Sequence, residues 1–417
     1  MILLLSQFGI ILVSIVVFLV VILFLVLILL YARKKLTPQG EVQLKINNRE
    51  MQVSPGSTLL STLSDNEIYL PSACGGMGTC GMCTCQVLEG GGSILPTETG
   101  FFTRKEQQNN WRLGCQVKVR EDMGIKVPEA VLDIKKYECE VVSNRNVATF
   151  IKEFIVKLPE GESLDFQSGG YVQIDVPKID VDFSKDILVE EVFRDEWDKF
   201  GLWDLKMKNS EETYRAYSMG NHPAEGNIVM LNIRIATPPW DVSHGRFKNV
   251  NPGICSSYIF SRKPGDKVMV SGPYGEFFIK DTKNEMIYVG GGAGMAPMRS
   301  HIFHLFHTLK TGRKVSYWYG ARSKREIFYE DHFRDIEKEF PNFTFNIALS
   351  EPAEEDKWEG PVGFIHQVLY DNYLRYHEEP EEIEYYMCGP PMMNSAVSNL
   401  LYDMGVPDEM IDFDDFG

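Results

Sequence analysis

The chain has 417 residues, of which 44% are hydrophobic and 24% are charged. This length exceeds one ordinary domain, so about three folded units are expected. The formal net charge of −16 argues against a nucleic-acid ligand, because binding a phosphate backbone requires a basic face.

The N-terminal segment is almost wholly apolar. From Phe8 to Tyr31 every residue is apolar or glycine except Ser14. A helix of this length rises about 36 Å, which is enough to cross a hydrocarbon core of about 30 Å. Basic residues follow at 33–35, so the positive-inside rule puts the N-terminus outside and the rest of the chain in the cytoplasm. We predict a single transmembrane helix over 3–31 rather than a cleaved signal peptide, which would need a basic start, a shorter apolar core and a small-residue cleavage site.

Residues 38–130 are predicted to form a small β-rich domain wrapped on a helix, because short alternating runs are separated by turn residues. The expected elements are a hairpin over Glu41–Val53, a helix capped by Ser57 and running through Leu63, a Gly- and Cys-rich loop over Ser72–Cys85, and strands around Gln86–Leu88 and Cys115–Val119.

Four cysteines of this region are spaced as Cys74-x5-Cys80-x2-Cys83, with Cys115 further along. Disulfides are disfavoured in the cytoplasm, so clustered cysteines are better explained as ligands. Four thiolates are what a 2Fe–2S cluster needs, two on each iron. The alternative, a zinc site, would call for a second Cys-x2-Cys pair. Cys85 is a competing thiol, to which we assign a buried, non-ligand role.

The segment Cys-Gly-Gly-Met-Gly-Thr-Cys-Gly-Met-Cys at 74–83, followed by Arg-Leu-Gly-Cys at 112–115, resembles a plant-type ferredoxin domain. Five residues lie between Cys74 and Cys80, one more than in the usual plant-type spacing. The resemblance implies a β-grasp fold and the 2Fe–2S ligands Cys74, Cys80, Cys83 and Cys115.

The remainder of the chain divides into two further regions. Residues 135–279 carry longer alternating runs that indicate an antiparallel β-barrel, interrupted by a charged and aromatic insertion at about 177–213. Residues 284–417 alternate apolar strands with helices, which indicates a doubly wound parallel sheet. The barrel strands are expected at Tyr137–Val142, Thr149–Leu158, Tyr171–Val176, Ile228–Ile235 and Lys267–Ser271; the later elements at Met286–Val289, Met298–Leu309, Val315–Tyr319, Phe328–Phe340, Phe343–Ala348, Ile365–Tyr373, Glu384–Cys388 and Met392–Met404.

Arg215-Ala216-Tyr217-Ser218 resembles the R-x-Y-S motif of the ferredoxin–NADP reductase family. The resemblance implies that Arg215 meets the pyrophosphate of FAD and that Tyr217 and Ser218 lie against the isoalloxazine. A fixed guanidinium pairs well with phosphate, and an aromatic plane can stack on a flavin. Gly253 and Ser256 match the family's G-x-x-S phosphate loop at a helix N-terminus.

The run from Gly290 through Gly292 and Gly294 to Pro297 follows a strand and opens a helix. It is not G-x-G-x-x-G, but it resembles the same family's nicotinamide loop. By the same resemblance, Cys388 in Cys-Gly-Pro lies beside the nicotinamide and helps place its C4 against the flavin N5.

Two further residues follow from this resemblance. Glu351 stands where NADP-selective members tend to carry a basic residue, and its charge would repel a 2′-phosphate, so NADH is favoured. Phe416 can serve as the C-terminal aromatic that covers the flavin.

His301, His304 and His307 are not expected to share a metal ion, because steps of three on a helix turn the outer two about 120° apart.

The order of anchor, ferredoxin, FAD barrel and NADH domain resembles the family of F subunits of the bacterial sodium-translocating NADH:quinone reductases. The resemblance implies hydride transfer from NADH to FAD and single-electron transfer through the cluster to integral membrane subunits. Ubiquinone reduction and sodium export at the bacterial inner membrane would follow. One alternative is the reductase component of an oxygenase, which is normally soluble. Another is a tethered electron carrier that has lost NADH oxidation, against which the intact glycine loop and Cys388 count.

Overall fold

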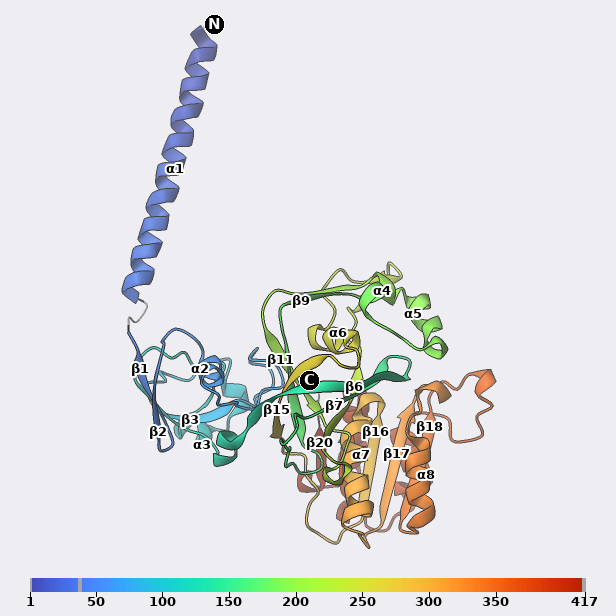
Figure 1. Cartoon of the computed structure of the whole chain (residues 1–417). Helices are drawn as coiled ribbons and strands as arrows, with labels where there is room; N and C mark the ends of the chain where they lie inside the picture. Colours follow the sequence, from blue (N-terminus) through green and yellow to red (C-terminus); the bar gives the residue numbers. More distant parts are fainter. Residues whose placement is uncertain (1, 37–39, 415–417) are drawn as a thin grey trace. The chain divides into compact units, whose positions relative to one another are not determined.

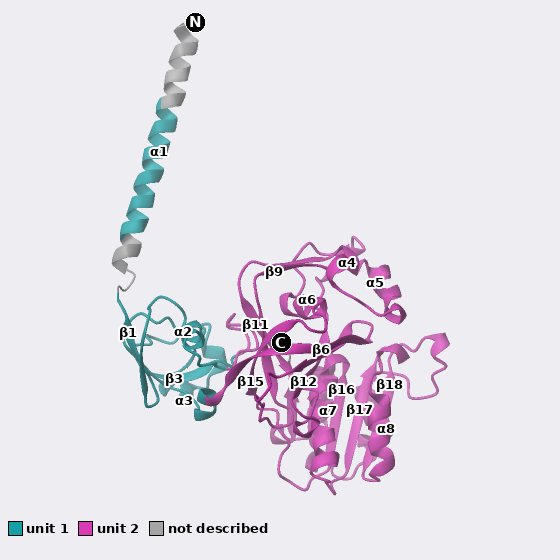
Figure 2. Cartoon of the chain, in the orientation of Figure 1, with its two compact units in different colours: residues 1–70, 81–132 teal, residues 71–80, 133–417 magenta. Residues whose placement is uncertain are grey.

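The computed structural model describes residues 2–36 and 40–414. Contacts divide the chain into two compact units, one of residues 1–70 and 81–132 and one of residues 71–80 and 133–417 (Figure 2). The loop 71–80, which carries the first two clustered cysteines, is therefore grouped with the second unit.

Helix α1 (Ile2–Leu36) is one continuous helix. Within it, Val13–Tyr31 is long and apolar enough to cross a membrane, and it is the one such span among the described residues. The side chains of this span are exposed rather than packed into a protein core. Its length and composition therefore suit a lipid environment.

The first unit holds a five-stranded sheet in the order β2-β1-β5-β3-β4. β1 pairs parallel with β5, and the other neighbours are antiparallel. Helix α2 (Leu59–Asp65) buries Leu59 and Leu63 in one core with Leu44 and Ile46 of β1. The expected β-grasp fold is confirmed. The strands are β1 (Val42–Ile46), β2 (Arg49–Val53), β3 (Thr84–Glu89), β4 (Trp111–Leu113) and β5 (Met123–Lys126).

Two local expectations for this unit were wrong. Thr58, not Ser57, caps α2, and its hydroxyl accepts a hydrogen bond from the Ser61 backbone at 3.1 Å. The segment Cys115–Val119 is not a strand, because the chain turns there and the Gln116 N–H bonds the Leu113 carbonyl. Its alternating apolar residues face the core without joining a ladder.

The second unit begins with a six-stranded antiparallel sheet in the order β11-β8-β15-β6-β7-β12. A bridge between Met219 and Leu231 joins its two end strands, which closes the sheet into the expected barrel. Helix α6 (Ile254–Ser261) packs its buried residues into the barrel core. The strands are β6 (Lys135–Ala148), β7 (Ile151–Lys157), β8 (Tyr171–Val176), β11 (Thr213–Ser218), β12 (Ile228–Arg234) and β15 (Lys267–Tyr274).

The insertion is an ordered part of this unit. β9 (Ile179–Asp182) and β10 (Lys206–Asn209) form an antiparallel ribbon, and the short helices α4 (Phe183–Asp186) and α5 (Arg194–Phe200) lie between them in the chain. Trp197 of α5 is buried, and its indole donates a hydrogen bond to the Thr149 carbonyl at 2.7 Å. The insertion thus shares the core of the barrel.

The last region is a five-stranded parallel sheet in the order β18-β17-β16-β19-β20. Along β16 (Met286–Gly291), Tyr288 packs with α7 and α8, whereas Ile287 and Val289 pack with α9 and α10. Helices therefore cover both faces, and Figure 1 shows α7 and α8 along one of them. This confirms the doubly wound arrangement. The other elements are β17 (Val315–Ala321), β18 (Phe343–Leu349), β19 (Glu384–Cys388), β20 (Ile411–Asp414), α7 (Met295–Phe303), α8 (Glu330–Glu339), α9 (Ile365–Asn372) and α10 (Pro391–Asp403).

Two features of this sheet differ from expectation. Helix α7 begins at Met295 rather than Met298 and ends in a π-helical turn over His304–Thr308. Pro297 still lies in its first turn, where a missing N–H costs no hydrogen bond. Strand β20 was not expected, and it adds the C-terminal segment to the edge of the sheet beside β19.

Candidate functional site

The cluster loop brings two thiols together. The Sγ atoms of Cys74 and Cys80 lie 3.3 Å apart. Hydrogen bonding from Cys80, outweighing burial, lowers the pKa of Cys74 to about 3. Gly75, Gly76 and Gly78 all have left-handed backbone conformations with φ between 66° and 85°, which favour glycine. This conformation folds the loop tightly around the two sulfurs.

The first unit brings the other two candidate ligands to neighbouring strands. Cys83 immediately precedes β3, and its carbonyl accepts a hydrogen bond from the Gly114 N–H at 2.7 Å, next to Cys115. Both cysteines are buried. In the described part of the chain, no three His, Cys, Asp or Glu side chains lie close enough together to hold one metal ion. Cys74, Cys80, Cys83 and Cys115 together supply four thiols, the number of thiolates that a 2Fe–2S cluster takes.

Cys85 differs from these four. It points into the core of the first unit with no exposed surface. Burial raises the pKa of its thiol to about 12, so it is neutral at physiological pH. A neutral thiol packed among apolar side chains supports the non-ligand role that the sequence predicts.

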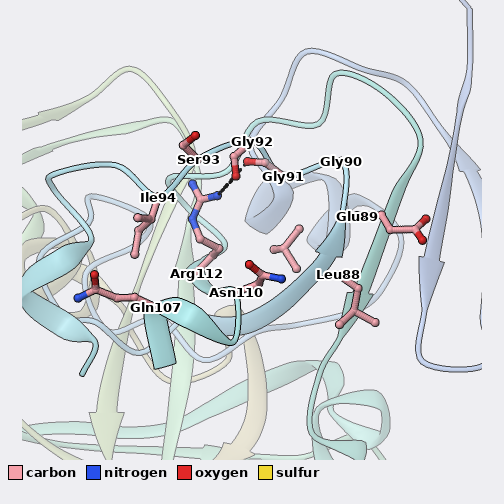
Figure 3. A pocket seen from close by; sticks show the side chains of 11 residues that line it. Leu88, Glu89, Gly90, Gly91, Gly92, Ser93, Ile94, Gln107, Asn110 and Arg112 are labelled. Carbon is pink, nitrogen blue, oxygen red and sulfur yellow. Dashed lines mark hydrogen bonds between the residues drawn. The ribbon is translucent and has the colours of Figure 1, made fainter. Parts of the chain in front are cut away.

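A buried ion pair that the sequence analysis missed lies beside Cys115. Arg112, only 4% exposed, donates to both carboxylate oxygens of the fully buried Glu98 at 2.7–3.1 Å and to the carbonyls of Gly91 and Gly92. Figure 3 shows this guanidinium reaching the glycine turn at the rim of a cavity of about 230 Å³. The motif Arg-Leu-Gly-Cys at 112–115 was the one sequence feature that could have indicated a role for Arg112. The pair fixes the strand that leads to Cys115.

Arg215 of the predicted flavin site lies on β11, half-buried. Its Nη1 donates to the Tyr214 carbonyl at 2.6 Å and to the Thr213 hydroxyl at 3.2 Å. The cluster loop runs close by, because a Cβ on Gly75 would lie 2.4 Å from the same Nη1. The guanidinium is thus fixed, as a phosphate-binding arginine requires.

Tyr217 and Ser218 complete the motif on the same strand. Burial raises the pKa of the Tyr217 phenol well above its ordinary value, and Cys255 of α6, which is hydrogen-bonded to it, adds to the shift. Ser218 donates its hydroxyl to Asp414 Oδ2 at 2.5 Å. Asp414 ends β20, where it is paired with Cys388 of β19. The flavin motif and the end of the nicotinamide strand are therefore linked through one side chain.

Gly253, which the sequence predicts to belong to a phosphate loop, is the N-cap of α6. Its N–H donates to the Ala236 carbonyl at 2.8 Å, and the Ser256 hydroxyl accepts from the Ala236 N–H at 3.1 Å. A Cβ on Gly253 would lie 2.5 Å from that of Ala236, so only glycine fits this approach. Ser256 thus shapes the loop, and the N–H groups in the first turn of a helix such as α6 suit an anion.

The glycine loop meets Cys388 directly. Gly290 pairs with Cys388 between β16 and β19, and Gly292 has a left-handed φ of 56°. A Cβ on Gly294 would lie 2.0 Å from the Cys388 carbonyl oxygen, so this glycine lets α7 approach β19. The Cys388 side chain is 0% exposed and packs in the sheet core. The structure brings all four residues to the C-terminal edge, where such sheets bind nucleotides.

Glu351 lies at the same edge. It follows β18, its side chain is exposed, and its N–H donates to the carbonyl of Arg322 at 2.8 Å. Phe416 lies outside the described residues. His301 is a core residue, stacked on Phe277 with its Nε2 3.1 Å from the Phe277 carbonyl oxygen, and burial lowers its pKa to about 4.

Three family models match the chain in the order that the fold indicates. They are a 2Fe-2S iron-sulfur cluster binding domain over 42–120, an oxidoreductase FAD-binding domain over 202–279 and an oxidoreductase NAD-binding domain over 288–399. The chain therefore has binding domains for a 2Fe–2S cluster, FAD and NAD.

Similar solved structures include two reductases. The ferredoxin reductase of carbazole 1,9a-dioxygenase has 26% identity and a TM-score of 0.58, with 91% of this chain and 99% of that one covered. A cytochrome P450 reductase from Amycolatopsis has 21% identity and a TM-score of 0.62, covering 90% and 98%, which supports the fold alone.

Much closer relatives are found among known sequences. The F subunit of the Na(+)-translocating NADH-quinone reductase of Idiomarina loihiensis is 54% identical, covering 93% of this chain and 95% of its own length. The protein of the same name from Neisseria meningitidis is 51% identical and covers 98% and 99%. Identity at this level over nearly the full length places the chain in the family of Na(+)-translocating NADH-quinone reductase F subunits.

Proposed function

We propose that the chain is the NADH-oxidising subunit of a sodium-translocating NADH:quinone reductase. The names of the full-length relatives support this, and so does the order of the three binding domains. The single observation that carries the proposal is the link from Ser218 through Asp414 to the strand position beside Cys388. It joins the flavin motif to the nicotinamide strand at one edge, which a hydride transfer requires.

Bound FAD takes up the two electrons of a hydride, and a bound 2Fe–2S cluster carries one electron at a time. The chain's own residues bind and orient these groups. Arg215 and the start of α6 would neutralise the flavin pyrophosphate, and Tyr217 and Ser218 would hold the ring system. The loop Gly290–Gly294 would let the backbone approach the nucleotide closely, and Cys388 at the end of β19 would help to position the nicotinamide.

The cysteine pairs Cys74 with Cys80 and Cys83 with Cys115 would then hold the cluster as the exit for single electrons. The acceptor would be an integral membrane subunit of the same complex, with quinone reduction and sodium export downstream. A domain division into 38–130, 135–279 and 284–417 follows the sequence pattern and is proposed on that basis.

Helix α1 is proposed to anchor the chain in the bacterial inner membrane. Its apolar span Val13–Tyr31 suits a single crossing. The basic residues at 33–35 favour a cytoplasmic body and an outside N-terminus. Labelling of single cysteines placed before and after the helix in intact cells would test this orientation.

The test of the function uses the full chain purified in detergent. We expect about one FAD and two irons for each chain, and ferricyanide reduction driven by NADH. Co-purification with integral membrane subunits and sodium-stimulated quinone reduction would extend the result to the complex. A preparation without iron, or one indifferent to NADH, would refute the proposal, and transfer of electrons to an oxygenase instead would favour the alternative.

A further inference from the structure

Arg322 lies at the nucleotide-binding edge of the parallel sheet. It directly follows β17, whose Gly320 pairs with Gly291 of the glycine loop, and its carbonyl is bonded to Glu351. At such edges an acidic residue takes the ribose 2′-hydroxyl of NAD, whereas an arginine accommodates the 2′-phosphate of NADP. Glu351 favours the first and Arg322 alone would favour the second. The preference between NAD and NADP therefore depends on the groups that surround the Arg322 guanidinium.

The insertion supplies the closest partner of this guanidinium. Arg322 Nη2 lies 2.5 Å from Glu196 Oε1, with the two side chains 40% and 16% exposed. Glu326 is more distant at 3.7 Å, and its carboxylate is already hydrogen-bonded by both the N–H and the hydroxyl of Thr149. Glu196 is thus the carboxylate that chiefly neutralises Arg322. The other oxygen of Glu196 has no hydrogen-bond partner among the described residues.

Helix α5 holds Glu196 in this position. On one side, Trp197 is buried in the barrel core and bonded to the Thr149 carbonyl. On the other, Asp195 forms a two-point ion pair with Arg325, with both distances 2.8 Å. A carboxylate fixed between these two anchors loses little conformational entropy on pairing, which makes the pair persistent.

We infer that Glu196 is a specificity-determining residue of the dinucleotide site, which selects NADH by occupying the guanidinium that a 2′-phosphate would need. This rests on the proposed NADH oxidation, and it assigns the insertion a role in choosing between the two dinucleotides. Glu351 and Glu196 then act together, one as a nearby negative charge and the other by engaging the cation.

The test compares the full chain with Glu196→Gln, in detergent, using ADP-ribose and its 2′-phosphorylated form in calorimetry. Glutamine keeps a hydrogen-bond acceptor but removes the charge. We expect binding of the 2′-phosphorylated nucleotide to tighten at least about tenfold, as a released charge-assisted contact allows, while ADP-ribose changes little. The kcat/KM for NADPH in ferricyanide reduction should rise by a similar factor.

Glu191→Gln is the matched control, because it removes one charge from the same insertion at an exposed side chain that pairs with Arg194 at 3.9 Å rather than with Arg322. It should leave both affinities unchanged, and adding Arg322→Gln to Glu196→Gln should abolish the gain. No gain in Glu196→Gln, an equal gain in Glu191→Gln, or a wild type that binds neither nucleotide would overturn the inference. A wild type that binds ADP-ribose but oxidises no NADH would refute the proposed function alone.

Discussion

The hydroxyl of Ser218 donates a 2.5 Å hydrogen bond to the carboxylate of Asp414. These residues are distant in the sequence, and they join β11 of the barrel to β20 of the parallel sheet. Asp414 is also the register partner of Cys388. One hydrogen bond therefore helps to set the position of the flavin motif relative to the nicotinamide strand.

Asp414→Ala should slow hydride transfer by about ten- to a hundredfold, because a hydrogen bond to a charged group contributes about 1.5–3 kcal/mol. Rapid-mixing measurements of flavin bleaching by NADH would follow this rate. Asp414→Asn is the control, since its amide oxygen can still accept the bond and its rate should stay near that of the wild type. An unchanged rate in Asp414→Ala would show that the bond does not position the two sites.

Gly294→Ala should destabilise the second unit and weaken NADH binding. The added Cβ would lie 2.0 Å from the Cys388 carbonyl oxygen, so α7 must move away from β19. Overpacking of this kind typically costs about 1–3 kcal/mol. Thermal unfolding and the KM for NADH would measure both effects. Gly312→Ala is a matched control, because a Cβ there meets nothing within 4 Å, and equal losses in both variants would contradict the packing argument.

The sequence predicted the fold correctly, and it named candidate site residues only where the pattern is local. The glycines, cysteines and the R-x-Y-S motif are short runs whose chemistry is visible without partners. The roles of Asp414, Glu98 and Glu196 were missed because each depends on a residue distant in the chain. Cys115–Val119 was wrongly assigned as a strand because burial alternates there while its one bridge, between Lys118 and Thr58, does not extend into a ladder.

The Glu98–Arg112 pair should stabilise the first unit, and Glu98→Gln should lower its stability by about 3–5 kcal/mol, because a buried guanidinium would lose its counter-charge. Iron content should fall with it, since the pair fixes the strand next to Cys115. Melting followed by visible circular dichroism would measure the change. Glu50→Gln is the control, because Glu50 forms an exposed ion pair with Lys45. This substitution should lower the stability by less than about 1 kcal/mol. Equal losses of stability in Glu98→Gln and Glu50→Gln would contradict the buried-pair argument.

The same pair predicts a loss of stability in acid. Burial alone would raise the pKa of Glu98, but hydrogen bonds from Arg112 and from two backbone N–H groups outweigh it and lower the pKa below its ordinary value. The stabilisation is therefore present above the unfolded pKa of about 4.3 and is lost as the pH falls through the lower folded value. Glu98→Gln should flatten this part of the stability profile. An unchanged acid limb in that variant would show that another carboxyl group causes it.

Cys83 and Cys85 stand two residues apart and should respond oppositely to substitution. Cys83→Ala should abolish the cluster, seen as lost iron and lost visible absorbance, because one iron would lack a thiolate. Cys85→Ala should keep both irons and cost only about 1 kcal/mol of stability, since it removes a small, neutral, buried thiol. Its pKa of about 12 means that it offers no thiolate at neutral pH. If Cys85→Ala lost the cluster while Cys83→Ala kept it, the ligand assignment would have to be exchanged.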